Sequence, residues 1–115
     1  MHIGRVLSLL LLLLAACGGD GAEAPEGCAD PVAATTIELA DFVFRPDCLS
    51  ADAGATITLD NTGDAPHTFT VTGTDVDFDV DAGTSVDARL SGVDPGTYAV
   101  TCTYHPQMEA TLTIG

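Results

Sequence analysis

From Thr35 to the end of the chain, apolar and polar residues alternate in short runs that are separated by glycine, proline, aspartate and asparagine. Successive side chains of a β-strand point to opposite faces of a sheet, so this period of two predicts strands with one buried face. No stretch of the chain shows a helical period. Seven or eight short strands without helices predict an all-β fold, a two-sheet antiparallel sandwich with Greek-key connections.

The same alternation assigns the residues that face the core. In the first half of the sandwich the inward residues are expected to be Ile37, Leu39, Phe42, Phe44, Ile57, Leu59, His67, Phe69 and Val71. In the second half they are expected to be Val76, Phe78, Val80, Val86, Ala88, Leu90, Tyr98, Val100, Cys102, Leu112 and Ile114. Turns are predicted at 60–64 and 94–96, where Asn, Gly and Pro gather. His67 and Cys102 should therefore face one interior.

The N-terminal 16 residues have the pattern of a secretory signal peptide. Arg5 supplies a positive charge and residues 6–14 are apolar except for Ser8. This run is too short to span a bilayer, which needs about 20 residues. Ala15 and Ala16 precede Cys17, which resembles the lipobox of bacterial lipoproteins, whose cysteine becomes the lipid-modified first residue. The alternative is an ordinary secretory leader with an incidental cysteine.

Three segments are therefore expected: a signal peptide over 1–16, a lipid-anchored flexible linker over 17–33, and a folded domain over 34–115. The linker is rich in Gly, Ala, Asp, Glu and Pro and has few large apolar residues with which to form a core. The expected location is the bacterial cell envelope outside the cytoplasm, in the periplasm or at the cell surface, with the lipid on Cys17 inserted in a membrane. We expect a monomer.

The charge of the chain excludes nucleic acid as a partner. The formal net charge is −14, and beyond the leader the chain has no lysine and only the two arginines Arg45 and Arg89. Such a chain cannot neutralise phosphates. The acidity either steers a basic protein partner or only keeps the protein soluble. Residues 75–81 alternate four aspartates with apolar residues, which predicts a solvated acidic face rather than a calcium loop, because same-face neighbours on a strand are nearly 7 Å apart.

The segment Cys102-Thr-Tyr-His105-Pro-Gln-Met108 collects a thiolate, an imidazole and a thioether within seven residues. Beyond the leader, His67 and His105 are the only histidines and Met108 is the only methionine. Each of these residues, taken singly, is more often structural than metal-binding. Jointly they favour copper over zinc, because zinc sites seldom use a thioether, and a His₂Cys set with a weak axial Met is the blue-copper electron-transfer site.

The sequence resembles the cupredoxin family from Thr35 to the end of the chain. The resemblance is carried by Phe44-Arg45-Pro46, by Asn61 followed by Pro66-His67, and by Gly96-Thr97-Tyr98 leading to the segment 102–108. Two residues separate Cys102 from His105, and two separate His105 from Met108. This short spacing is similar to that of amicyanins, whereas plastocyanins and pseudoazurins have longer ligand loops.

The resemblance implies one copper ion that cycles between Cu(I) and Cu(II) and is held by His67, Cys102, His105 and Met108. His67 would be the buried imidazole, the edge of His105 would reach the surface and conduct the electron, and Met108 would be the weak axial ligand. In this family the residue after the first histidine is often asparagine, with its backbone N–H directed at the thiolate. Thr68 stands there in this chain, and its backbone can supply the same donor.

The implied function is a lipid-anchored single-electron carrier, and its partner would be a cytochrome or another membrane or envelope oxidoreductase. The alternative is a module that stores, delivers or buffers copper, which the lack of a Met-rich or His-rich tract disfavours. An enzyme is not expected, because a copper oxidase or nitrite reductase would need spare histidines for a second metal centre. If Cys17 carries lipid and Cys102 binds metal, Cys28 and Cys48 remain to form a disulfide in an oxidising compartment.

Overall fold

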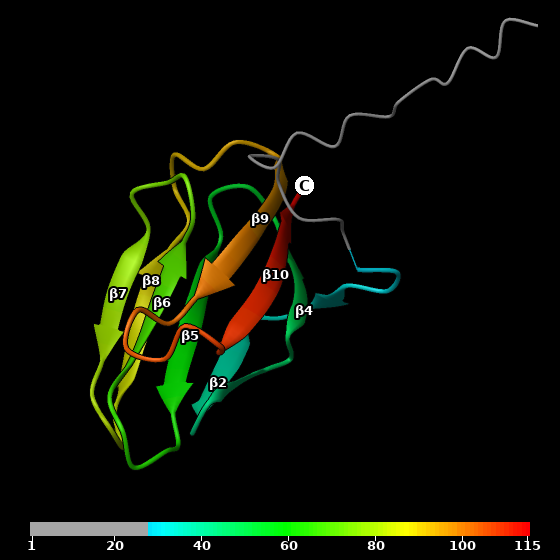
Figure 1. Ribbon diagram of the computed structural model, residues 1–115. Coiled ribbons are helices and arrows are strands. Elements are labelled where there is room, and N and C mark those ends of the chain that lie inside the picture. Colours follow the sequence, from blue (N-terminus) through cyan, green and yellow to red (C-terminus); the bar gives the residue numbers. More distant parts are fainter. Residues whose placement is uncertain (1–27) are drawn as a thin grey trace, which may run out of the picture.

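The computed structural model describes residues 28–115; Cys17, the expected signal peptide and most of the expected linker lie outside the described residues. Two β-sheets pack face to face (Figure 1), and residues 28–115 contain no helix. This confirms the all-β cupredoxin-like sandwich. The described part holds ten strands, two more than the upper expectation, because β1 and β4 are short segments whose alternation is too brief to detect.

One sheet has six strands and the other has four. In spatial order, the six-stranded sheet consists of β1 (Val32–Ala33), β4 (Cys48–Ala51), β10 (Glu109–Ile114), β9 (Gly96–Thr101), β6 (His67–Val71) and β7 (Asp77–Val80). The four-stranded sheet consists of β3 (Val43–Arg45), β2 (Thr36–Ala40), β5 (Thr56–Asn61) and β8 (Ser85–Arg89).

The sheets are mixed rather than fully antiparallel. β4 pairs in parallel with β1 and β10, and β2 pairs in parallel with β5. After β3 the chain crosses from the four-stranded sheet to the six-stranded sheet, so β4 lies beside strands that are distant in sequence. Alternation reveals which face of a strand is buried, but it carries no information about the direction of a neighbour that no hairpin connects.

The core between the sheets is formed by the residues that alternation predicts. Those that are buried include Ile37, Leu39, Phe44, Ile57, Leu59, Phe69, Val71, Val80, Val100, Leu112 and Ile114. The rings of Phe44 and Phe69 meet edge to face across the two sheets, with their centroids 6.1 Å apart. Full burial of each large apolar side chain contributes about 1.5–3 kcal/mol to the free energy of unfolding. Packing of these two faces therefore fixes the sandwich on which the site is built.

Phe42 is an exception, and the expectation that it faces the core is wrong. Asp41 and Phe42 form the turn between β2 and β3, in which Ala40 is the partner of Val43. Phe42 has φ of 71° and 49% of its surface is exposed. Alternation applies only within a strand, so the turn interrupts the pattern and Phe42 does not face the core as Phe44 does. The predicted turn at 60–64 also begins later than expected, because β5 continues through the buried Asn61.

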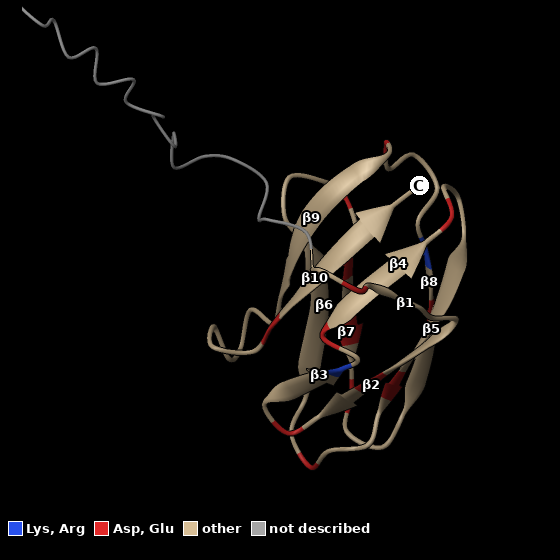
Figure 2. Ribbon diagram, turned by 90° about the vertical axis from the view of Figure 1, so that its right-hand side faces the viewer, with Lys and Arg blue, Asp and Glu red and all other residues tan. Residues whose placement is uncertain are grey.

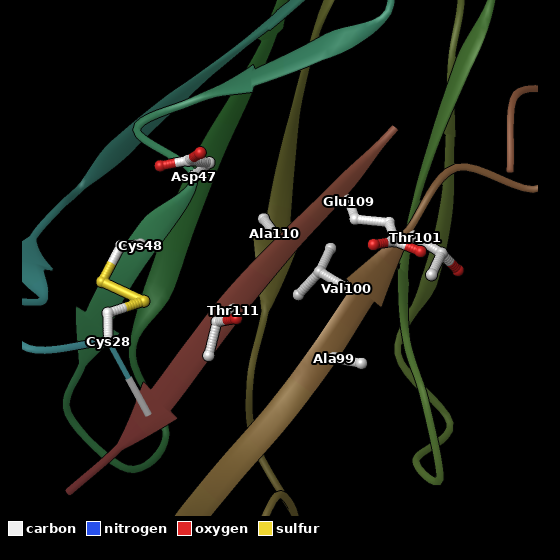
Figure 3. Close-up of a pocket in the computed structure, with 9 residues that line it drawn as sticks. All are labelled: Cys28, Asp47, Cys48, Ala99, Val100, Thr101, Glu109, Ala110 and Thr111. Atoms are coloured by element: carbon white, nitrogen blue, oxygen red, sulfur yellow. A yellow bond between two sulfur atoms is a disulfide. The ribbon is translucent and has the colours of Figure 1, made fainter. Parts of the chain in front are cut away.

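Cys28 and Cys48 form the expected disulfide, with a Cα–Cα distance of 5.9 Å. Figure 3 shows this bridge at one end of a pocket whose other residues come mainly from β9 and β10, among them Thr111. β1 pairs with β4, so residues at the end of the expected linker are attached to the sandwich. The bridge and β1 together hold the N-terminal end of the described chain against the six-stranded sheet.

Carboxylates are distributed over both sheets, and the only basic side chains among residues 28–115 are Arg45 and Arg89 (Figure 2). The aspartates of β7 are exposed, as the alternation predicts. Asp77 accepts a hydrogen bond from the Thr70 hydroxyl at 2.9 Å, across the β6–β7 pair. A helix that is long and apolar enough to cross a membrane is absent from the described part of the chain.

Candidate metal centre

Three potential ligand atoms meet at the end of the sandwich that is drawn lower in Figure 1, where β5 leads into β6 and β9 leads into β10. Cys102 directly follows β9, and His67 is the first residue of the neighbouring antiparallel strand β6. Cys102 Sγ lies 3.9 Å from His67 Nδ1 and 3.8 Å from His105 Nδ1. Ligand atoms of all three residues lie within 4.8 Å of one another. The structure thus brings together two segments 35 residues apart.

The loop between β9 and β10 is held by its own backbone. The His105 amide donates to the Cys102 carbonyl at 3.3 Å, and the Met108 amide donates to the His105 carbonyl at 2.9 Å. The Cys102 amide in turn donates to the Met108 carbonyl at 3.2 Å, which closes the loop. Met108 is fully buried, whereas His105 is half-buried. Two successive turns therefore carry His105 back toward Cys102 and return Met108 to the core.

The Cys102 sulfur accepts a hydrogen bond from the backbone N–H of Thr68 at 3.3 Å. This confirms that Thr68 supplies the expected backbone donor. The Thr68 side chain has a second role that the sequence did not indicate: its Oγ1 accepts a hydrogen bond from the Thr103 amide at 2.9 Å. Threonine therefore ties the His67 segment to the Cys102 segment through its hydroxyl.

Asn61 holds the loop that precedes His67. Its side chain is buried, and Nδ2 donates to the carbonyls of Ala65 and Val80, each at 2.9 Å. Its Oδ1 accepts from the Gly63 amide at 2.9 Å. Because both Nδ2 and Oδ1 of its side chain are hydrogen-bonded, Asn61 fixes the path of residues 62–66. It thereby also fixes the point at which His67 begins β6.

Asp41 contacts the side of His67 that faces away from Cys102. Its Oδ1 lies 3.2 Å from His67 Nε2. The carboxylate also accepts from the amides of Asp64 and Ala65, at 3.1 and 3.2 Å. These two backbone donors lower the pKa of Asp41 below its ordinary value; desolvation partly opposes them, and the contact with His67 lowers the pKa further. Sequence reasoning missed Asp41, because an aspartate in a hairpin turn carries no signal of a histidine 26 residues away.

Phe42 packs against both histidine rings at the exposed part of the site, and Tyr104, the residue before His105, is a second exposed aromatic residue. The ring centroid of Phe42 lies 4.7 Å from that of His105 and 6.4 Å from that of His67. Tyr104 is 54% exposed, and its hydroxyl donates to Asp79 at 3.0 Å. This hydrogen bond to a carboxylate raises the pKa of Tyr104. His105 therefore lies beneath Phe42, an exposed aromatic ring.

The donor set fits a single soft metal ion. Distances of 3.8 and 3.9 Å between the sulfur and the two Nδ1 atoms leave room for one ion bound to all three, since first-row metals lie about 2.0–2.3 Å from such donors. One thiolate with two imidazoles is the ligand set of mononuclear copper centres, and Met108 at the end of the loop is the residue type that completes it. Fold and site together define a copper-binding β-sandwich protein.

The comparisons place the chain in one family. The family model described as "Cupredoxin-like domain" matches residues 6–114, and this chain belongs to that family. The family and the donor set identify the cofactor as one copper ion. The chain is also similar to the methylamine utilization protein MauL of Methylophilus methylotrophus, with 32% identity over 115 residues. The match covers 95% of this chain and 66% of MauL, so the chain spans about two thirds of that relative.

Solved structures share the fold at low sequence identity. A purple cupredoxin from Nitrosopumilus maritimus superposes with a TM-score of 0.59 at 17% identity, covering 70% of this chain and 99% of the other. An amicyanin variant in its reduced state superposes with a TM-score of 0.58 at 20% identity, covering 81% of this chain and 97% of the other. The two likenesses confirm the cupredoxin sandwich.

Proposed function

We propose that the protein is a single-electron carrier whose copper ion is held by His67, Cys102, His105 and Met108. The observation that carries this proposal is the convergence of ligand atoms from His67, Cys102 and His105 within 4.8 Å of one another, at one end of a cupredoxin sandwich. Bound copper supplies one-electron exchange between its Cu(I) and Cu(II) states. Solved amicyanins, which share the fold, are described as Cu(I) and as oxidised forms, which supports the same role here.

The protein's contribution is to hold the donors still. Cys102 is fixed by the Thr68 amide and by the closed backbone loop that ends at Met108. His67 is bonded through Nε2 to Asp41. A site whose donors are fixed by backbone and buried side chains changes little in geometry when the charge on the metal changes, so little reorganisation opposes electron transfer. This arrangement suits a carrier.

His105 is the proposed route by which the electron leaves. His67 and Cys102 are fully buried, whereas His105 is half-buried. A partner that docks at this end would meet Phe42 and Tyr104, both about half exposed. The partner proposed is a redox protein, either a cytochrome or a membrane or envelope oxidoreductase. Asp41 contacts His67 and Asp79 contacts Tyr104 at this end of the sandwich, and these carboxylates favour a partner with basic residues.

The proposed location is outside the cytoplasm, with residues 1–16 as the signal peptide and a lipid on Cys17. The disulfide between Cys28 and Cys48 supports an oxidising compartment. Residues 17–33 would be the tether and residues 34–115 the copper domain, acting as a monomer. Mass spectrometry of the mature protein and fractionation of a Cys17→Ser variant test the anchor, because the variant should leave the membrane fraction.

Spectroscopy of the purified domain after addition of Cu(II) tests the proposed site. A strong blue absorption band and a small copper hyperfine splitting in the EPR spectrum are expected. Absence of both would defeat the proposal. Cyclic voltammetry then separates a carrier from a storage or delivery module: a carrier keeps its copper through repeated cycles in the presence of a chelator, whereas a delivery module loses it.

A further inference from the structure

We infer that Asp41 is a positioning residue of the metal centre, whose carboxylate accepts the Nε2–H of His67 and holds Nδ1 toward Cys102. The inference rests on the proposed copper function and extends it to a residue in a turn outside both ligand segments. Its basis is a chain of contacts that runs from the β2–β3 turn, through Asp41, to the first histidine of β6.

The hydrogen bond decides which ring nitrogen of His67 carries the proton. An ionised carboxylate is only an acceptor, so the His67 Nε2 that lies 3.2 Å from Asp41 Oδ1 must be the N–H in this contact. In a neutral imidazole the other nitrogen then has a free lone pair. That nitrogen, Nδ1, is the one 3.9 Å from Cys102 Sγ. Asp41 thus selects the tautomer that leaves the metal-facing nitrogen able to bind.

Asp41 is itself held in place. The amides of Asp64 and Ala65 both donate to its carboxylate, so the group is tied to the loop that precedes His67. Gly63 makes room for this approach: a Cβ at that position would overlap Asp41 Oδ1 and lie 2.8 Å from Cγ. The φ of Gly63 is not in the left-handed region, so space rather than backbone conformation requires glycine there. The site is therefore built around the carboxylate.

The neighbouring residue links the same turn to the second histidine. Phe42 follows Asp41 and adopts φ of 71°, a left-handed conformation that is strained for a residue other than glycine. Its ring lies against His105, with the centroids 4.7 Å apart. A single turn thus contacts both imidazoles, Asp41 by a hydrogen bond and Phe42 by packing.

The first test uses metal-free native protein and needs no copper. Nitrogen-15 NMR at about pH 8, where histidine is neutral, should show His67 in the Nε2–H tautomer. The Asp41→Ala variant should show a mixture of tautomers at His67, while His105 keeps the pattern it has in the native protein. Finding the Nδ1–H tautomer at His67 of the native protein would overturn the inference.

The second test measures Cu(I) affinity by competition with a chelator. Asp41→Ala should weaken binding by about 10–100-fold, the usual effect of removing a partner of a metal-binding histidine. Gly63→Ala, which keeps the carboxylate but displaces it, should weaken binding in the same direction. The matched control is Asp81→Asn, which removes an exposed carboxylate from the turn after β7 and should leave the affinity unchanged. Equal effects at Asp41 and Asp81 would mean that only surface charge matters and would refute a positioning role.

The Asp41→Asn variant keeps an oxygen acceptor in the same place and removes its charge. We expect this variant to retain the native tautomer and to raise the reduction potential, because a neutral acceptor leaves the imidazole less electron-rich. An unchanged potential would contradict the inference. If the native protein bound no copper at all, the proposed function would fail, whereas the NMR experiment would still decide whether Asp41 orients His67.

Discussion

Thr68 Oγ1 accepts a hydrogen bond from the Thr103 amide at 2.9 Å, and this bond joins the residue after His67 to the residue after Cys102. The Thr68 amide meanwhile donates to the Cys102 sulfur at 3.3 Å. One residue therefore fixes both the electronic surroundings of the thiolate and the distance between the two segments that carry the proposed ligands. Its hydroxyl and its backbone perform separable tasks.

Replacing Thr68 with valine should separate these tasks. The variant keeps the backbone donor to Cys102 and loses the acceptor for the Thr103 amide, so we expect a loss of about 1 kcal/mol in the free energy of unfolding and a retained blue band. Urea unfolding of the metal-free protein measures the loss. The control is Thr58→Val, whose hydroxyl bonds Asp87 at the surface of the other sheet and should matter less. Equal losses in both variants would argue against the linking role.

The proposed ligands can be distinguished by their effects on the spectrum and the potential. Cys102→Ser should abolish the blue band, because the band requires a thiolate on copper. Met108→Leu should keep a blue centre and raise its reduction potential, because a weak axial thioether stabilises Cu(II) more than an alkyl group does. Visible spectroscopy and voltammetry check both expectations. A Cys102→Ser variant that remained blue would disprove thiolate ligation.

Alanine usually stabilises a protein more than glycine does, and the φ of 71° at Phe42 predicts the opposite order of stability at this position. Both Phe42→Ala and Phe42→Gly lose the ring, but only glycine adopts this φ without strain, so Phe42→Gly should be more stable than Phe42→Ala by about 1 kcal/mol. At the neighbouring strand residue Val43 the order should be the usual one, with alanine more stable than glycine. Denaturant unfolding of the four variants provides the comparison. The same order at both positions would contradict the strained turn.

Removal of the disulfide should destabilise the domain without altering the site. Cys28 and Cys48 are 20 residues apart, and closure of a loop of this length contributes about 3 kcal/mol through the entropy of the unfolded chain. The Cys28→Ala, Cys48→Ala double variant should lose about this amount in thermal or chemical unfolding and keep its copper spectrum. Thiol counting on the unreduced, metal-free protein in denaturant should find only Cys102 free among the cysteines from Cys28 onward.

The lowered pKa of Asp41 predicts a pH-dependent contribution to stability. A carboxyl whose pKa is lower in the folded than in the unfolded state stabilises the fold above its unfolded-state pKa, and this contribution is lost as the pH falls through the folded-state pKa. Asp41→Asn cannot titrate. The stability difference between the native protein and this variant, both without metal, should therefore shrink as the pH falls below about 4, the ordinary pKa of an aspartate. A stability difference that did not change with pH would show that the backbone donors do not stabilise the ionised form of Asp41.

Much of the fold follows from local chemistry. Alternation assigned Ile57, Leu59, Phe69 and Leu112 to the core, and all four are fully buried. It failed at Phe42, where a turn between β2 and β3 interrupts the period, and it did not reveal β4, whose parallel partner β10 lies far along the chain. Periodicity reports which side of a strand is apolar, and it is silent on which strands pair and in which direction.

The sequence by itself determined the clustering of Cys102, His105 and Met108 and the shared inward face of His67 and Cys102, because these depend on spacing and strand geometry over a few residues. Only the tertiary structure decided that Asp41 bonds His67 Nε2, that Thr68 bonds Thr103, and that Phe42 lies on His105. Each of these contacts joins segments that meet through the packing of two sheets. Contacts of that kind depend on strand order and register, which no local pattern of residues encodes.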